Sequence, residues 1–259
     1  RETTRDRTME HNERQMRFAL LIDADNAKAD RIEDILSEAL KRGIVSVRRA
    51  YGDWTTQQLA GWKNYLHQFA IQPIQQFRYT VGKNATDSAM IIDAMDLLYA
   101  GNLEGFCIVS SDSDFTRLAT RLRESGKIVY GFGERKTPAP FKAACDQFIY
   151  VENLAPIKES DDLEKNGIQP KTTKDLKGDT RLVSTIRAAI DANADDDGWA
   201  FLGKVGSHAI RELPDFSPKN YGYSKLKDLI DNIKLFEVKE VPAREGLSNS
   251  VFIRDQRPK

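Results

Sequence analysis

The chain has 259 residues, of which 40% are hydrophobic and 30% are charged, and this composition excludes wholesale disorder. Lys plus Arg equals 39 and Asp plus Glu equals 39, so global attraction to nucleic acid is excluded and any such binding must use local patches. The absence of an apolar run near the roughly 20 residues of a membrane span, and of a signal-peptide hydrophobic region, favours a protein that is neither membrane-embedded nor secreted.

The only cysteines are Cys107 and Cys145, which are too few for a framework of disulfides or a zinc knuckle. A reducing compartment fits this cysteine usage best, and we predict a cytoplasmic location. The length suits two domains of ordinary size.

Residues 1–15 are polar and are predicted to form a flexible leader. From residue 16 to 154, predicted strands and helices alternate. Strands are expected at 18–22, 44–51, 71–79, 105–110, 128–132 and 147–150. Helices are expected at 29–41, 55–69, 86–98, 115–125 and 141–144. This alternation predicts an α/β sandwich with a mostly parallel sheet.

The pattern lapses between residues 155 and 178, where charged and polar residues dominate, and this predicts a linker. Helical periodicity returns at 182–190, 205–210 and 226–233, followed by predicted strands at 235–241 and 250–254. Three short helices and a β-hairpin predict a small winged-helix-like domain over 179–257.

Aspartates mark the ends of three elements of the first domain. Asp23 ends the first strand, Asp87 opens a helix, and Asp112 and Asp114 follow the strand at 105–110. A parallel sheet brings the carboxyl ends of its strands to one edge, and carboxylates gathered there repel one another unless a divalent cation neutralises them. Without His or Cys nearby, oxygen ligands predict Mg²⁺ or Mn²⁺. The alternative explanation for the two helix-opening positions is ordinary helix capping.

Five further residues are candidates for supporting roles. Asn26 could hydrogen-bond the carboxylates or cap the following helix, and both interpretations stay open. Asp25 lies on the same loop. Asp93 lies about 120° around its helix from the helix-opening aspartate and is expected to support the site rather than bind metal. Lys83 and Arg117 are expected to steer a phosphate backbone.

Three motifs together resemble the NYN domain, a branch of the PIN-like nucleases (LabA-like in bacteria), over residues 16–154. They are Leu-Leu-Ile-Asp-Ala-Asp-Asn at 20–26, Gly-Lys-Asn-Ala-Thr-Asp at 82–87 with Asp93 beyond, and Val-Ser-Ser-Asp-Ser-Asp-Phe at 109–115. The resemblance implies a PIN-like three-layer α/β/α sandwich and metal-dependent endoribonuclease activity. It also implies that Asp23, Asp87, Asp112 and Asp114 are the catalytic and metal-binding positions, with Asn26 as their companion. One departure is Lys-Asn-Ala-Thr-Asp where the family more often has Lys-Gly-Val-Asp.

The second domain resembles the OST-HTH, or LOTUS, domain. The resemblance rests on the Gly- and aromatic-rich stretches at 195–208 and 216–230. It implies a winged-helix-like adaptor that binds RNA or protein. Residues with side chains suited to phosphates and bases are Lys219, Asn220, Tyr221, Tyr223, Lys225 and Lys227. The alternative for Tyr221 is a place in the hydrophobic core.

The sequence therefore favours a metal-dependent endoribonuclease whose second domain holds RNA or a protein partner. Two alternatives remain open at this point. Asp23-Ala-Asp25 superficially matches the Asp-x-Asp of haloacid-dehalogenase-type phosphatases, although Asn-Ala rather than Gly-Thr follows it. The second alternative is a nuclease-like domain without catalysis that serves as an RNA-binding or adaptor module.

Overall fold

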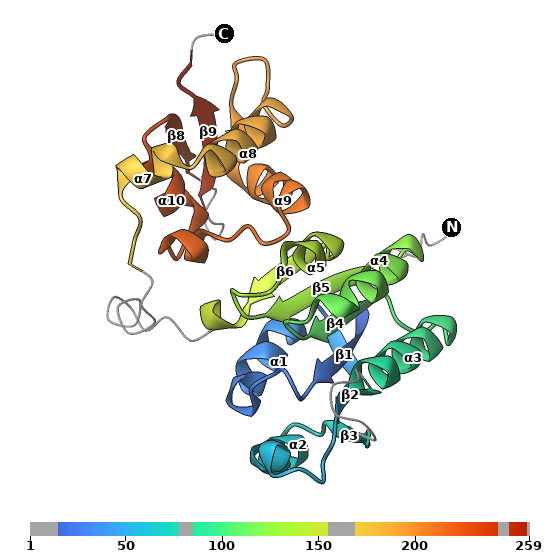
Figure 1. Ribbon diagram of the computed structural model, residues 1–259. Helices are drawn as coiled ribbons and strands as arrows, with labels where there is room; N and C mark the ends of the chain where they lie inside the picture. The colour runs from blue at the N-terminus through green and yellow to red at the C-terminus, as the bar shows by residue number, and fades with distance from the viewer. Residues whose placement is uncertain (1–14, 78–84, 155–168, 243–248, 258–259) are drawn as a thin grey trace, which may run out of the picture.

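The computed structural model describes residues 15–77, 85–154, 169–242 and 249–257. The described residues up to 154 form an N-terminal domain, and those from 169 onward form a C-terminal domain (Figure 1). Most of the predicted leader, Lys83 and much of the predicted linker lie outside the described residues. In the part of the chain that is described, none of the helices has both the length and the apolar character needed to cross a membrane.

The N-terminal domain is built on a six-stranded parallel sheet with the strand order β3-β2-β1-β4-β5-β6. The strands are β1 (Arg17–Asp23), β2 (Ile44–Gly52), β3 (Gln72–Gln75), β4 (Gly105–Val109), β5 (Ile128–Gly133) and β6 (Gln147–Tyr150). The strand order reverses between β1 and β4, and ligands of such sheets bind beyond the carboxyl ends of the strands at this reversal. Ile22 pairs with Val109, so Asp23 and Ser110 leave the sheet side by side.

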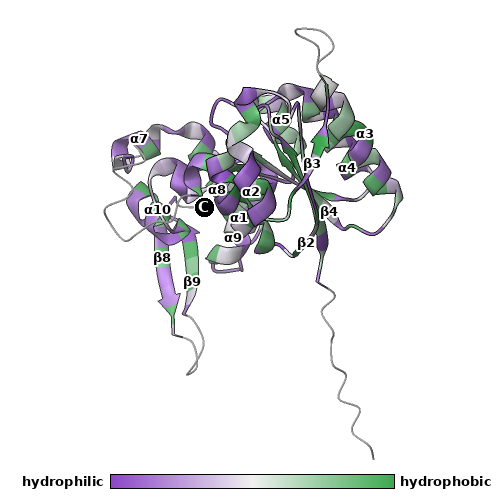
Figure 2. Ribbon diagram, turned by 90° about the horizontal axis from the view of Figure 1, so that it is seen from below, coloured by the Kyte–Doolittle hydropathy of each residue, from purple (hydrophilic) through white to green (hydrophobic). Residues whose placement is uncertain are grey.

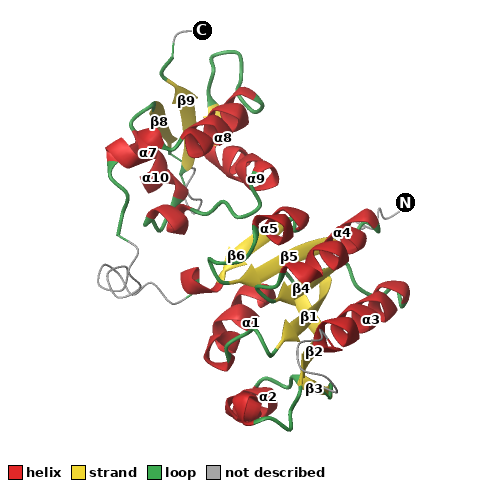
Figure 3. Ribbon diagram, viewed as in Figure 1, coloured by secondary structure: helices red, strands yellow, loops and turns green. Residues whose placement is uncertain are grey.

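Helices cover both faces of this sheet (Figure 3). One face packs on α1 (Ile32–Leu40) and on the 3-10 helix η2 (Gln57–Trp62) with α2 (Lys63–Gln68), through a core that includes Ile35 and Trp62. The other face packs on α3 (Ala85–Tyr99), α4 (Thr116–Glu124) and α5 (Ala139–Ala144), through Met90, Leu118 and Phe141. Short 3-10 helices η1 (Ala29–Arg31), η3 (Ser113–Phe115) and η4 (Val151–Asn153) complete the domain. The predicted three-layer sandwich is confirmed.

The C-terminal domain combines helices with a three-stranded antiparallel sheet of order β7-β9-β8. Its elements are α7 (Thr173–Gly178), α8 (Thr180–Asp191), β7 (Ala200–Phe201), α9 (Leu202–Glu212), η5 (Pro218–Tyr221), α10 (Leu226–Ile233), β8 (Phe236–Val241) and β9 (Ser250–Asp255). Figure 2 shows hydrophilic residues along much of the β8–β9 hairpin, which projects from the domain. A core of its own, including Leu182, Val205 and Ile230, stabilises the domain.

The predicted linker is wrong at its carboxyl end. Residues 173–178 form α7, and Leu176 of this helix is fully buried in the core of the C-terminal domain. Thr172 and Asp175 form a capping box that fixes the start of α7, because each side chain accepts a hydrogen bond from the other residue's backbone N–H. The domain therefore begins before residue 179.

Candidate metal centre

Asp23, at the end of β1, is fully buried and held in a defined position. Its Oδ2 accepts hydrogen bonds from Asn26 Nδ2 at 2.6 Å and from Ser110 Oγ at 2.8 Å. Its Oδ1 is also buried, yet has no hydrogen-bond partner among the described residues. Burial raises the pKa of Asp23 above its usual value, although the hydrogen bonds from Asn26 and Ser110 work in the opposite direction.

Three more carboxylates meet beside this strand end, and we call Asp87, Asp112 and Asp114 the acidic triad. One carboxylate oxygen from each lies within 4.8 Å of the others. Asp87 comes from the first turn of α3 and is buried, whereas Asp112 and Asp114 come from the turn after β4. Asp112 Oδ1 also accepts a hydrogen bond of 2.9 Å from Asp114 N and so caps η3. Capping and membership of the triad are thus compatible roles.

The charges of the acidic triad are not compensated within it. Burial, followed by repulsion from Asp23, Asp112, Asp114 and Asp25, raises the pKa of Asp87 to about 7. A divalent cation would relieve this repulsion, because it supplies positive charge between the clustered carboxylate oxygens. The ligand atoms of the triad are all carboxylate oxygens, and the buried Oδ1 of Asp23 adds an acceptor that has no hydrogen-bond partner among the described residues. The residues therefore fit Mg²⁺ or Mn²⁺.

Ser110 hydrogen-bonds both Asp23 and the backbone of Asp112, and the sequence did not predict this role. Its Oγ donates to Asp23 Oδ2 and accepts a 3.0 Å hydrogen bond from Asp112 N. The side chain is buried, with 2% of its surface exposed. The local sequence contained one signal for this role, because a serine directly after a buried strand can bond both to the neighbouring strand end and to its own loop.

Ser110→Ala is expected to lower the affinity for Mn²⁺ about tenfold and the free energy of unfolding by about 1–3 kcal/mol. The change removes a donor from Asp23, which lies beside the acidic triad, and an acceptor from the backbone N–H of Asp112, which belongs to the triad. Mn²⁺ titration by calorimetry and urea unfolding would measure the two effects. Ser113→Ala is the matched control because Ser113 is exposed. Equal Mn²⁺ affinity in the two variants would contradict the role of Ser110.

Asp93 lies on α3 outside the acidic triad and binds two residues of β2. Its Oδ2 accepts a 2.5 Å hydrogen bond from the hydroxyl of fully buried Tyr51 and a 2.8 Å ion pair from Arg49 Nη1. These contacts tie α3 to the sheet six residues, or about 1.7 turns, beyond Asp87. Sequence reasoning expected a supporting Asp93 but did not find Arg49 or Tyr51, because their partner is far along the chain. The supporting role stays a prediction.

The other candidates for supporting roles differ in their contacts. Asp25 is half-buried, and its charge contributes to the raised pKa of Asp87. Asn26 serves the carboxylates by donating to Asp23, while η1 begins three residues later at Ala29. Arg117 is exposed on the first turn of α4. Its role in steering RNA, and that of Lys83, stay predictions.

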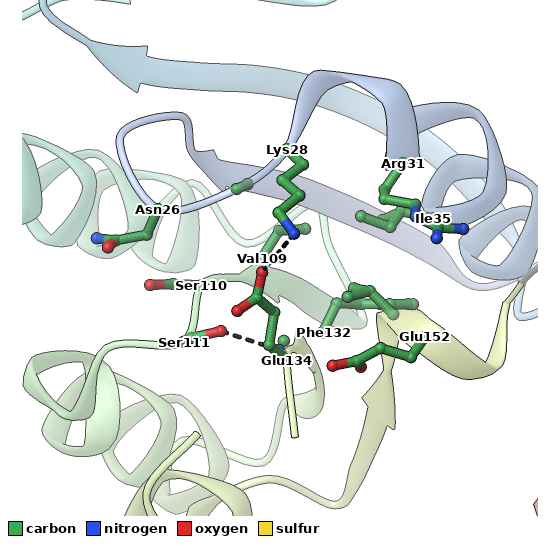
Figure 4. A pocket seen from close by; sticks show the side chains of 13 residues that line it. Asn26, Lys28, Arg31, Ile35, Val109, Ser110, Ser111, Phe132, Glu134 and Glu152 are labelled. Atoms are coloured by element: carbon green, nitrogen blue, oxygen red, sulfur yellow. Dashed lines mark hydrogen bonds and ion pairs between the residues drawn. The ribbon is translucent and has the colours of Figure 1, made fainter. Parts of the chain in front are cut away.

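A cavity of about 180 Å³ opens beside the centre at the same edge of the sheet. Asn26, Ser110 and Ser111 line one part of it, and Ile35 and Phe132 provide an apolar wall (Figure 4). Across it, Lys28 Nζ pairs with Glu134 Oε1 at 3.3 Å, and Ser111 Oγ accepts from the backbone N–H of Glu134. The cavity joins the loops that follow β1, β4 and β5.

The candidate RNA-binding residues of the C-terminal domain have different surroundings. Lys225 is exposed, whereas Lys227 pairs with Glu240 at 2.8 Å and the Tyr223 hydroxyl donates to Lys171 O at 2.9 Å. Tyr221 packs on the domain core and faces Phe216, with ring centroids 6.5 Å apart. Lys219 and Asn220 contact the N-terminal domain. Their roles in binding RNA stay predictions.

A parallel α/β sheet with a carboxylate cluster at its strand-order reversal, joined to a small helix-and-strand domain, defines a two-domain α/β protein with a candidate metal centre. The chain belongs to the NYN domain family, whose profile matches residues 17–158. An OST-HTH/LOTUS domain matches residues 177–247, in the order expected from the sequence.

Among solved structures, a protein of unknown function from Vibrio parahaemolyticus is 18% identical, with 52% of this chain and 93% of that chain covered and a TM-score of 0.44. An uncharacterized protein from Nitrosomonas europaea is 26% identical, with 40% and 87% covered and a TM-score of 0.27. MurG from Acinetobacter baumannii is 13% identical, with 64% and 49% covered and a TM-score of 0.36. No curated protein matches the chain.

Proposed function

We propose that this protein is a metal-dependent endoribonuclease that hydrolyses RNA phosphodiester bonds, and that its C-terminal domain binds the RNA. The observation that carries the proposal is the acidic triad beside the buried, unsatisfied Oδ1 of Asp23. A domain of nuclease fold that gathers four acids at the ligand-binding edge of its sheet is suited to phosphate chemistry.

Asp87, Asp112 and Asp114 would hold Mg²⁺ or Mn²⁺, with Asp23 at their side. When bound, such an ion activates a water molecule and neutralises charge on the scissile phosphate. Asp87 must release its proton to take part, because its pKa is about 7 in the metal-free protein. Asn26 and Ser110 orient Asp23, and the cap that Asp112 provides for η3 fixes the direction of its carboxylate.

RNA is the proposed substrate class because an OST-HTH/LOTUS domain accompanies the nuclease fold. We place the protein in the cytoplasm, because a chain with two buried thiols, Cys107 and Cys145, suits a reducing compartment.

The alternatives are less well supported. A haloacid-dehalogenase-type mechanism needs Asp23 to attack phosphorus, but Asp23 is fully buried and its Oδ2 already accepts two hydrogen bonds. A non-catalytic binding module would have no need to keep four acids together at the cost of repulsion that raises the pKa of Asp87.

Cleavage of end-labelled single-stranded RNA, with and without metal, tests the proposal. We expect Mg²⁺ or Mn²⁺ to support cleavage at internal positions and EDTA to stop it, because chelation removes the charge that the carboxylates need. A DNA strand of the same sequence serves as the comparison for substrate class. RNA left intact while p-nitrophenyl phosphate is hydrolysed would reverse the assignment in favour of a phosphatase.

A further inference from the structure

The two domains meet at β6, the edge strand of the parallel sheet (Figure 1). Edge strands present backbone N–H groups that no neighbouring strand pairs. Phe148 N, in the middle of β6, donates a 2.8 Å hydrogen bond to Pro214 O of the C-terminal domain. Proline has a carbonyl but no N–H, so this contact satisfies one donor of the edge without starting a new ladder.

A largely buried group of polar side chains flanks this backbone contact. Asp215 Oδ2 accepts a 2.6 Å hydrogen bond from the Tyr150 hydroxyl and a 3.1 Å ion pair from Lys142 Nζ. Lys142 and Asp215 expose less than a fifth of their side chains, 19% and 18%. Burial alone would raise the pKa of Asp215, but the hydrogen bonds from Tyr150 and Lys142 outweigh it and hold that pKa below its usual value. Tyr150 and Lys142 therefore stabilise the charged form of Asp215.

A second set of contacts uses two of the residues that the sequence assigns to RNA. Asn153 Nδ2 donates to Asn220 Oδ1 at 2.7 Å, and Lys219 Nζ donates to Asn153 O at 2.8 Å. Asn220 Nδ2 in turn donates to Asp215 O, which fixes the loop before η5. In this arrangement the polar atoms of Lys219 and Asn220 face the N-terminal domain.

The contact with the N-terminal domain gives the Lys219 ammonium group a weaker hydrogen-bond partner than a nucleic acid would. Its ammonium group donates to a neutral carbonyl, and burial lowers its pKa. A phosphate oxygen would pair the ammonium group with an opposite charge, which a neutral carbonyl does not offer. Interfaces between domains that rest on polar contacts are also generally reversible.

We propose that this polar contact docks the C-terminal domain on β6 and α5, and that RNA competes with docking for Lys219 and Asn220. The inference rests on the proposed RNA-binding role of the C-terminal domain. In the docked form Lys219 and Asn220 are not available to RNA. RNA binding through these residues therefore requires the two domains to separate at this contact.

A double variant of the N-terminal domain, Lys142→Met with Tyr150→Phe, tests the competition without altering the RNA-binding candidates or the acidic triad. It leaves Asp215 Oδ2 without its two side-chain donors. Lys63→Met with Tyr65→Phe on α2 is the matched control, because it makes the same changes of charge and hydroxyl away from β6. Full-length proteins are titrated in EDTA with a fluorescein-labelled single-stranded RNA. Amide hydrogen exchange at Phe148 reports docking directly.

We expect the double variant to bind RNA roughly tenfold more tightly than the control, because the apparent affinity rises with the fraction of open molecules. Exchange at Phe148 should be faster in this variant, and saturating RNA should accelerate it in the parent. Lys219→Ala should weaken RNA binding in the double variant. Equal RNA affinity of variant and control would overturn the competition alone, whereas no RNA binding by any of the proteins would overturn the proposed role of the domain as well.

Discussion

Asp112→Asn is expected to lower the rate of RNA cleavage by at least about a hundredfold while the protein remains folded. Asp112 contributes one carboxylate to the acidic triad, and an amide carries no negative charge for a divalent cation. Asn is nevertheless as good an N-cap as Asp, so the hydrogen bond that Asp112 Oδ1 accepts from Asp114 N can be retained. Initial rates on labelled RNA at saturating Mn²⁺, together with the circular dichroism spectrum, would measure both halves of this prediction.

The control for this variant is Asp96→Asn. Asp96 is exposed on α3, nine residues after Asp87, and the change removes the same charge at a distance of about 13 Å along the helix. We expect its cleavage rate to match that of the parent. Parent-like cleavage by purified Asp112→Asn would show that the acidic triad is not the catalytic metal site.

Asp87→Asn is expected to stabilise the metal-free protein at pH 8 and to abolish stabilisation by metal. The pKa of Asp87 rises from 3.8 to about 7 on folding, so the folded state binds more protons than the unfolded state between these values. The free energy of unfolding therefore falls as pH rises from about 4 to about 7, and above pH 7 the full penalty applies. Removing the charge should restore about 1–2 kcal/mol, after screening and the lost helix-dipole interaction are allowed for.

Thermal denaturation at pH 5 and pH 8, each with EDTA and with Mn²⁺, measures this effect. In the parent, Mn²⁺ should raise the melting temperature more at pH 8 than at pH 5, because a proton on Asp87 competes with the metal at the lower pH. In EDTA at pH 8, Asp87→Asn should melt about 2–6 °C above the parent. A metal-induced rise that is the same at both pH values, or that survives in the variant, would contradict the assignment of Asp87.

Much of the N-terminal fold could be predicted because its strands are short apolar runs that end abruptly. The predicted strand 147–150 coincides with β6, and the predicted strands 44–51 and 128–132 differ from β2 and β5 by one residue each. Periodicity failed for α7, since a six-residue helix with a single buried residue, Leu176, has no repeat to detect. Its capping box was the available signal.

The acids of the candidate centre could be predicted because each follows or opens an element that the sequence defines locally. Their partners could not. Ser110 acts on Asp23 across two neighbouring strands, and Tyr51 meets Asp93 across 42 positions of the chain. Such pairs depend on strand order and register, and one sequence gives no direct information about either. For the same reason the sequence could not show that Lys219 contacts Asn153, because this contact joins two domains.

The proline at the domain contact has a consequence for how the protein unfolds. Because Pro214 offers β6 a carbonyl and no N–H, the parallel sheet ends at β6 rather than continuing into the antiparallel sheet of the C-terminal domain. The two domains also keep separate hydrophobic cores. The two domains therefore share neither a continuous hydrogen-bonded sheet nor a hydrophobic core. Unfolding of one domain is then weakly coupled to unfolding of the other, and each domain melts as a separate cooperative unit.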